Sequence, residues 1–491
     1  MVMDRCLRVV TVLACSAGLL ACGSDSSAED ETGSSNDDAP SGEDESGAGE
    51  DTAESGESGE DTAETGESTG EDTGASGLTY WKDTKAILDS RCVGCHAEGE
   101  VAPFSLETWE QVENFAPLLA ASILDGSMPP WPPVAGCNDY LDERALTEDE
   151  RETLLIWLDD AYPEGDVADA PPDPEPSTPF EPTISVALPE PYTPSGTLDD
   201  YRCFAIPWPE EITEESFVVA QNTFPDRSEL VHHVITFVAD PDEAAFYQGL
   251  DDAEDGPGYT CFGGPGKTDW SARWLGAWVP GAQVMHAPEG TGLRVEPGSL
   301  LIVQVHYNLI GGEVGPDQTS IGFELADSVE REGAYVPVVN YGWVLGATPM
   351  SIPAGASEVS HSVSIARDSP IFLYLTQSLG VGSSVTLDLW EAALHMHLLG
   401  ERGHLEVAKS GDEASCLLEI DEWDFNWQGS YQLEEPVEFG PGDSLELGCV
   451  FDNSAENQPI VDGEPKTPED VGWGDGTFDE MCLGVVYVAA Q

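Results

Sequence analysis

The chain has 491 residues, and 94 acidic against 17 basic side chains give it a formal net charge of −77. This charge disfavours binding to nucleic acid or to anionic lipid surfaces, because both are themselves negatively charged. The length is enough for two or three folded domains.

The N-terminus has the pattern of an export signal. Arg5 and Arg8 precede an apolar stretch, Val9–Leu20, that is too short to span a bilayer comfortably. The stretch leads into Cys22 and resembles a bacterial lipoprotein signal, in which cleavage leaves this cysteine as the lipidated first residue. The alternative is an ordinary signal peptide in which the cysteine has no role. We expect a signal at 1–22 and a lipid-anchored protein of the bacterial cell envelope, at the outer membrane.

Residues 23–77 have the composition of a disordered spacer. The sequence GEDTAESGES at 49–58 is repeated as GEDTAETGES at 59–68, and the whole stretch has no aromatic or basic residue. Because its carboxylates repel one another and it has little to bury, we expect an extended acidic tether.

A helical pattern follows at 78–170. Its periodicity predicts three helices, at Trp81–Leu88, Ser105–Leu124 and Thr147–Ala161. Thr147, with Glu150 three residues later, has the form of a capping box. The Pro- and Asp-rich stretch 168–182 then predicts a linker.

This helical region contains a motif for covalent haem. Cys92 and Cys95 with His96 form C-x-x-C-H, in which two thiols on one side of a turn can bond the vinyl groups while the imidazole faces the iron. A metal or redox C-x-x-C followed by a chance histidine is the alternative. We predict Met128 as the second axial ligand, because Met with His is the usual pairing in cytochromes c. Met128 could instead be a core residue. Residues 78–170 thus resemble a small cytochrome c domain.

Beyond the linker the pattern changes to short apolar runs separated by Gly and Pro turns. The predicted strands are Ser216–Ala220, Val231–Val238, Leu300–Tyr307, Ile371–Leu375, Val385–Leu389 and Gly484–Ala489. Many short strands at this density predict a mainly β fold built of β-sandwiches.

Five of the nine histidines fall in three clusters. They are His232 with His233, then His306, then His395 with His397. Imidazole suits copper, and a thioether such as that of Met481 favours Cu(I). These residues therefore predict two copper sites, whereas zinc fits poorly with a thioether ligand.

The spacing within each pair makes a structural prediction. His395 and His397 are two residues apart, so on a strand both project from one face while Met396 points into the packing. His232 and His233 are neighbours and would face opposite sides of a regular strand. Both can bind one ion only at a strand end or in a twisted segment.

From about residue 182 to 491 the chain resembles the copper type II, ascorbate-dependent monooxygenases. The motifs that carry the resemblance are Val231-His232-His233-Val234, Val303-Gln304-Val305-His306-Tyr307-Asn308, Leu394-His395-Met396-His397-Leu398 and Asp479-Glu480-Met481-Cys482. The resemblance implies two jelly-roll β-sandwiches, expected at 171–335 and 336–491, that face each other across a solvent-filled cleft. It also implies that the first three histidines hold an electron-transfer copper, and that the last two with Met481 hold an oxygen-binding copper.

The function that this resemblance implies is O2-dependent hydroxylation of a C–H bond in a small organic substrate. Its cofactors would be two copper ions and one haem c, and its electron donor an ascorbate-like reductant or a redox protein. We predict that the fused haem passes single electrons to the first copper. The alternative is a non-catalytic cell-surface lipoprotein that transfers electrons or holds copper.

One position departs from the family pattern. Where the peptide-processing members have an Arg that clamps the substrate carboxylate, this chain has Ala393, with Glu391 further back. This argues against peptidylglycine as the substrate. The segment 423–428 either lines the cleft with aromatic surface or forms a core strand.

The remaining cysteines suit an oxidising compartment. The resemblance implies a disulfide between Cys449 and Cys482, beside Met481, and a bridge between Cys203 and Cys261 would bracket the His232-His233 strand. Cys137 and Cys416 are left, either paired across domains or free.

Overall fold

The computed structural model describes residues 76–98, 102–172, 180–196, 198–261, 264–266, 271–282, 284–309, 314–411, 413–461 and 463–491. The predicted signal, the predicted lipidation site Cys22 and nearly all of the acidic spacer lie outside these residues. No helix within the described ranges is both long enough and apolar enough to cross a bilayer.

The first described elements are helical, as predicted. They are η1 (Tyr80–Thr84), α1 (Lys85–Arg91), α2 (Trp109–Asp125), α3 (Glu148–Asp159) and the short η2 (Val167–Asp169). Thr108 and Thr147 cap α2 and α3 with complete capping boxes, so the prediction at Thr147 is confirmed. The helices enclose a core in which Leu88, Val112 and Trp157 are fully buried.

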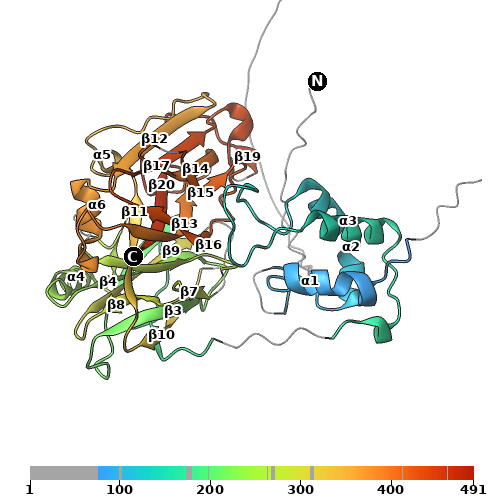
Figure 1. Ribbon diagram of the computed structural model, residues 1–491, viewed down its shortest axis with the longest axis horizontal. Coiled ribbons are helices and arrows are strands. Elements are labelled where there is room, and N and C mark those ends of the chain that lie inside the picture. Colours follow the sequence, from blue (N-terminus) through green and yellow to red (C-terminus); the bar gives the residue numbers. More distant parts are fainter. Residues whose placement is uncertain are drawn as a thin grey trace, which may run out of the picture. The chain divides into compact units, whose positions relative to one another are not determined.

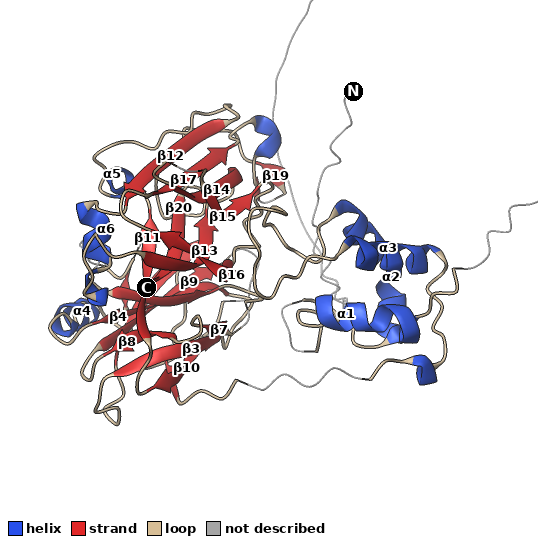
Figure 2. Cartoon of the chain, in the orientation of Figure 1, coloured by secondary structure: helices blue, strands red, loops and turns tan. Residues whose placement is uncertain are grey.

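Strands dominate the rest of the chain (Figure 2). The first half contains β1 (Ile184–Ala187), β2 (Asp199–Pro207), β3 (Ser216–Phe224), β4 (Val231–Ala239), α4 (Ala244–Asp251), β5 (Tyr259–Thr260), β6 (Arg273–Trp278), β7 (Met285–His286), β8 (Thr291–Val295), β9 (Leu300–Asn308), β10 (Ser320–Ala326) and β11 (Arg331–Val338). The second half contains α5 (Tyr341–Val344), β12 (Val359–Ala366), α6 (Pro370–Leu375), η3 (Gln377–Leu379), β13 (Leu387–His395), β14 (Gly400–Ala408), β15 (Ser415–Ile420), β16 (Ser430–Phe439), β17 (Ser444–Phe451), η4 (Ala455–Asn457), β18 (Ile460–Val461), β19 (Glu464–Pro465) and β20 (Leu483–Ala490). The mainly β prediction is confirmed.

The two halves share one sheet. Its strand order is β1-β10-β3-β8-β11-β20-β13-β16, with β7 added to β3 (Figure 1). β11 joins the halves, because it pairs in parallel with β8 and antiparallel with β20. The predicted domain boundary at 335/336 falls inside this strand, and the division into two sandwiches stays a prediction.

Two smaller sheets complete the halves. A five-stranded sheet, β5-β2-β9-β4-β6, belongs to the first half, and a four-stranded sheet, β12-β17-β14-β15, belongs to the second. Val234, Leu301 and Val305 lie in the core of the first half, and Leu394 and Leu447 lie in that of the second. β4, β9 and β13 are therefore held rigidly at the point where they carry the clustered histidines.

One predicted strand is wrong. Ile371–Leu375 is helical and belongs to α6. Ser369 caps this helix by accepting a hydrogen bond from the Phe372 N–H at 3.3 Å, and Pro370 occupies the first position, where its fixed φ suits a helix. A short apolar run has no periodicity that separates a strand from a buried helical turn.

All six cysteines that follow the helical motif are paired. The structure joins Cys203 to Cys261 and Cys449 to Cys482, the two predicted pairs, and it joins Cys137 to Cys416, which the sequence left open. The last bridge fastens the segment between α2 and α3 to β15 in the second half of the chain.

Candidate metal centre

Three of the predicted ligands meet between β4 and β9. His233 pairs directly with His306 across the two strands, and the register slips between Val231 and His233. This bulge gives β4 an extra residue at His232 and locally twists the strand. It is the irregularity that the adjacent histidines were predicted to need, because both can now turn toward one point.

The Nδ1 atoms of these histidines converge. His233 Nδ1 lies 3.3 Å from His232 Nδ1 and 3.4 Å from His306 Nδ1, and candidate ligand atoms of the three residues all lie within 4.8 Å of one another. We refer to these three residues as the first cluster. Three imidazole nitrogens around one point suit a copper ion better than a hard cation such as Mg²⁺.

Asp199 and Tyr201 on β2 support this arrangement, and the sequence analysis missed both. Asp199 Oδ1 accepts a hydrogen bond from His306 Nε2 at 2.9 Å, so that the ring's other nitrogen, Nδ1, is free to bind metal. The same carboxylate accepts a hydrogen bond from Thr477 Oγ1 at 2.8 Å. Tyr201 stacks on the His306 ring with 4.0 Å between centroids. Metal-binding histidines commonly have such a carboxylate partner.

Burial lowers the pKa of two rings of the first cluster. Burial, with the charges of His306 and His395, lowers the pKa of His232 to about 3, and burial lowers the pKa of His233 well below its usual value. Burial alone would raise the pKa of Asp199, but its hydrogen bonds to His306 and Thr477 bring it below the usual range. Neutral imidazole is the form that binds a metal ion.

The Asp199 contact makes a testable prediction. Asp199→Ala should weaken copper binding at the first cluster by about 10–100-fold, since the loss of such a partner releases the ring orientation of His306. Copper titration of the purified chain measures this. Asp200→Ala is the matched control, because Asp200 is the next residue on the strand but bonds Tyr192 and the Ser195 N–H instead. Equal affinities in the two variants would contradict the role of Asp199.

His395 and His397 form the second cluster, for which Met481 is the predicted third ligand. His395 is the last residue of β13, His397 lies just beyond it, and their ring centroids are 5.1 Å apart. Met396 between them is fully buried in the core, as predicted. His395 Nδ1 lies 2.5 Å from Gln428 Oε1, and His397 Nδ1 lies 3.0 Å from the Asp479 carbonyl oxygen. Both rings therefore donate from Nδ1 and leave Nε2 for a metal.

Glu480 links Met481 to this pair, a role that the sequence analysis did not assign. Its buried carboxylate accepts hydrogen bonds from the N–H groups of His397 at 2.9 Å, Leu399 at 2.6 Å and Met481 at 3.3 Å. Burial raises the pKa of Glu480 to about 8, against the opposing effect of these donors. The Cys449–Cys482 bridge fixes the residue after Met481. The backbone of Met481 is thus held through both neighbouring residues, Glu480 and Cys482.

The second pair is neutral for the same reason as the first. Burial lowers the pKa of His395 to about 4, although the bond to Gln428 works against this shift. Burial and the charge of His395 lower the pKa of His397 to about 3. Both rings are therefore in the form that binds a metal.

The two clusters lie close together. The rings of His233 and His395 are 6.4 Å apart, centroid to centroid. Phe425 stacks on His232 at 5.0 Å and contacts the edge of His397 at 6.1 Å. This differs from the solvent-filled cleft that the family resemblance implied, because an aromatic side chain from the 423–428 segment lies between the clusters. Of the two alternatives for that segment, the lining of the site is the one observed.

Comparison with known proteins identifies a family for part of the chain. Residues 381–489, which include His395, His397 and Met481, match the family described as copper type II ascorbate-dependent monooxygenase, C-terminal domain. DBH-like monooxygenase protein 1 of Gallus gallus is 23% identical over 276 residues, which cover 52% of this chain and 39% of that protein. Tyramine beta-hydroxylase of Caenorhabditis briggsae is 20% identical over 293 residues, which cover 58% and 45%. These matches support the copper type II monooxygenase family.

The extent of the likeness is limited. The chain spans less than half the length of these two curated relatives. Among solved structures, the major capsid protein P2 from bacteriophage PM2 aligns over 63% of this chain and 98% of its own, with 8% identity and a TM-score of 0.25. That score carries no argument about fold or function.

The predicted haem residues lie after α1. The thiols of Cys92 and Cys95 are free, and the His96 N–H donates to the Cys92 carbonyl at 2.9 Å in a tight turn. His96 Nδ1 lies 3.1 Å from the Phe104 carbonyl oxygen, to which it donates, so Nε2 is left for a ligand bond. Burial raises the pKa of Cys92 to about 12, which disfavours the thiolate that a metal site or a redox pair would use.

Met128 follows α2, which ends at Gly126 in the left-handed conformation. The Met128 N–H donates to the Ser122 carbonyl oxygen at 3.1 Å and so ties the residue to the last turn of the helix. Its role as an iron ligand stays a prediction.

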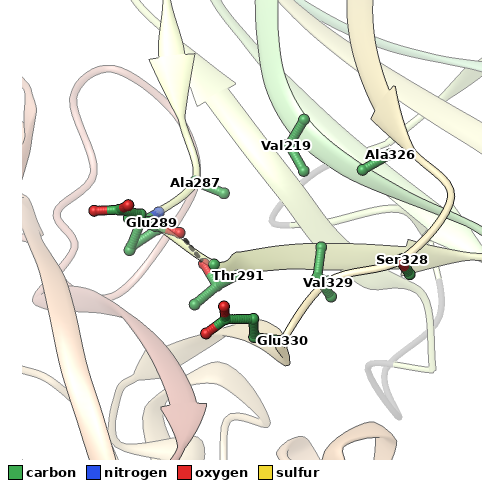
Figure 3. Close-up of a pocket in the computed structure, with 10 residues that line it drawn as sticks. Val219, Ala287, Glu289, Thr291, Ala326, Ser328, Val329 and Glu330 are labelled. Carbon is green, nitrogen blue, oxygen red and sulfur yellow. Dashed lines mark hydrogen bonds between the residues drawn. The ribbon is translucent and has the colours of Figure 1, made fainter.

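A cavity of about 420 Å³ lies apart from the predicted ligands (Figure 3). Val219, Ala326 and Val329 supply apolar surface, and Glu289 and Glu330 supply carboxylates. Figure 3 shows Glu330 beside Thr291, whose hydroxyl donates to the Pro288 carbonyl at 2.7 Å. None of the predicted copper or haem ligands lines this cavity.

Proposed function

We propose that this chain is a dicopper, O2-dependent monooxygenase that hydroxylates a C–H bond of a small organic substrate. The observation that carries the proposal is the pair of adjacent clusters, one with three converging Nδ1 atoms and one within a segment that matches a copper monooxygenase domain. In this proposal His232, His233 and His306 hold an electron-transfer copper. His395, His397 and Met481 hold the copper at which oxygen reacts.

The residues present fit two copper ions. In His306, His395 and His397 one ring nitrogen makes a hydrogen bond, and the other nitrogen is left free for a metal. His232 and His233 have neutral rings that are turned toward their neighbours. Bound copper supplies one-electron chemistry with dioxygen. The protein's own part is to orient the rings through Asp199, Gln428 and the Asp479 carbonyl, and Phe425 limits water between the clusters.

The polypeptide also limits the substrate. β13 presents Ala393 where the peptide-processing relatives have the clamping Arg, and Glu391 is fully buried with its carboxylate bonded to the Tyr335 hydroxyl at 3.0 Å. Neither residue offers a cation for a carboxylate. With a net charge of −77, the chain favours a neutral or cationic substrate over an anionic one.

We extend the proposal to one haem c in the helical region. Two free thiols and an imidazole whose Nδ1 bonds a backbone carbonyl fit covalent haem with axial His96. Haem supplies a one-electron carrier on the same chain as the copper ligands. Met128 would be its second axial ligand.

The same proposal includes two jelly-roll domains, a cleaved signal and a lipid anchor on Cys22 at the outer membrane. The anchor and the acidic spacer would leave the folded part in water, close to the membrane. Three disulfides suit a protein exposed to an oxidising compartment.

Metal content tests the proposal. The chain is produced in an exporting host with haem maturation supplied and Cys22 removed, and iron and copper are measured per chain. We expect one iron and two coppers, followed by O2 uptake with matching alcohol formation when amines and other small substrates are screened. O2 uptake that produces only peroxide would favour the non-catalytic alternative. A chain without tightly held copper would refute the oxygenase.

A further inference from the structure

The segment between α2 and α3 is fastened to the second half of the chain. We refer to residues 129–144 as the strap. Pro133 forms a bridge with Ile420, and Tyr140 forms one with Leu433, so the strap pairs with both β15 and β16. The Cys137–Cys416 disulfide locks this contact covalently. The strap therefore has a fixed place beside β16. The residue directly before it in the sequence is Met128, the proposed second axial ligand of the haem.

Two aromatic rings meet where the strap begins. The rings of Trp131 and Tyr431 lie edge to face with 5.3 Å between centroids. Tyr140 contacts both rings, at 6.1 Å and 5.8 Å, and its hydroxyl donates to the Leu417 carbonyl at 3.0 Å. Such edge-to-face contacts fix the rings relative to one another.

Trp131 is covalently close to Met128, the predicted second axial ligand of the haem. It lies three residues after Met128, so the two Cα atoms are at most about 11 Å apart even in a fully extended chain. An axial ligand at Met128 would place the haem edge near this indole ring.

Tyr431 is close to the second cluster through the pairing of its strand and through its position in the sequence. It is the second residue of β16 and lies opposite Ala392 on β13, the strand that ends at His395. Gln428, three residues before Tyr431, accepts the hydrogen bond of His395 Nδ1 at 2.5 Å. The packed rings of Trp131 and Tyr431, the three peptide units from Tyr431 back to Gln428 and one hydrogen bond thus join Trp131 to His395. The strap pairs with the half of the chain that carries the second cluster.

We propose that electrons from the haem reach the second cluster first, by way of Trp131, Tyr431 and Gln428. This rests on the proposed function, and it differs from the prediction that the first cluster is reduced first. In each step ferrous haem loses one electron and Cu(II) at His395 and His397 gains it, which gives ferric haem and Cu(I) without a proton. The first cluster then exchanges electrons across the 6.4 Å contact between His395 and His233.

The role of Trp131 is tested by intramolecular electron transfer without oxygen or substrate. A flash of light with a flavin photoreductant delivers less than one electron per haem, and haem absorbance is followed in chains loaded with Cu(II). In Trp131→Leu and Tyr431→Leu the first-order reoxidation of haem should slow by at least about tenfold, because the bridging ring is gone. Trp131→Phe should recover part of the rate.

The matched control is Trp274→Leu. Trp274 is a half-buried tryptophan on β6 that packs against Phe237 at 5.6 Å, and it lies in the first half of the chain. The Trp274→Leu chain should keep the wild-type rate of haem reoxidation. The variants of Trp131, Tyr431 and Trp274 should all keep the iron content, the copper content and the thermal midpoint of the wild-type chain within experimental error. An unchanged rate in Trp131→Leu with normal metal content overturns the inference and leaves the proposed function standing.

Two ligand variants decide which cluster receives the electron. His306→Ala removes a ligand of the first cluster, and His395→Ala removes one of the second. We expect fast haem reoxidation to persist in His306→Ala and to disappear in His395→Ala, with freeze-quenched copper resonance spectra showing which ion is reduced. The reverse pattern overturns the inference. A wild-type chain that binds no haem or no copper overturns both the inference and the proposed function.

Discussion

Met481→Leu should lower product formation by at least about 100-fold. Mutation of a residue that only hydrogen-bonds to a metal ligand already lowers metal affinity or activity by about 10–100-fold, and Met481 is proposed to be a ligand itself. Leucine has a similar volume but no sulfur, so the fold should be retained while the thioether donor is lost. The first cluster does not include this residue, and its copper affinity should not change. Product formed per O2 consumed and copper bound per chain measure the two effects separately.

Met396→Leu provides the matched control. Met396 lies between the two histidines of the second cluster, yet its side chain is fully buried in the hydrophobic core. The same chemical change there should cost less than about 1.5 kcal/mol in stability and leave product formation near the wild-type level. Equal activity in Met481→Leu and Met396→Leu would remove Met481 from the ligand set.

Glu480→Ala should destabilise the fold by about 3 kcal/mol or more, because buried N–H donors left without an acceptor cost about 1–3 kcal/mol each. The donors belong to His397, Leu399 and Met481, so the second cluster should also lose its geometry. Denaturant unfolding of the metal-free chain measures the stability, which separates this effect from copper binding.

The isosteric variant Glu480→Gln is the control for that experiment. Its amide oxygen can still accept from part of the donor set, so we expect less than half of the destabilisation seen with alanine. If Glu480→Ala lowers the free energy of unfolding by no more than an average substitution does, about 1 kcal/mol, then the carboxylate does not hold the backbone around His397 and Met481 together.

Local features of the sequence were predicted with most success. The helices at Trp109–Asp125 and Glu148–Asp159 have apolar periodicity and a capping residue directly before the first turn, and those signals act over three or four residues. The core position of Met396 followed from the alternation of side chains along a strand. The helix at Pro370–Leu375 was mistaken for a strand, because a short apolar run lacks a distinguishing period.

The partners of the ligands required the folded chain. Asp199 is 107 residues from His306, Glu480 is 83 residues from His397, and Gln428 is 33 residues from His395. An isolated Asp, Glu or Gln in the sequence has no pattern that assigns it to a histidine. Pairing of β2 with β9 brings Asp199 to His306, and the loops that precede β16 and β20 bring Gln428 and Glu480 to the second cluster.

The sequence by itself therefore predicted the candidate ligands, the C-x-x-C-H motif and the mainly β class of the larger part, and with the family resemblance it predicted two of the three disulfides. Tertiary structure decided how these parts meet: the bulge that turns His232 and His233 toward His306, the contact of His233 with His395, and the strap closed by Cys137 and Cys416. The physical reason is that ligand chemistry resides in single side chains and short spacings. Convergence depends on strand register and on contacts between residues far apart in the chain.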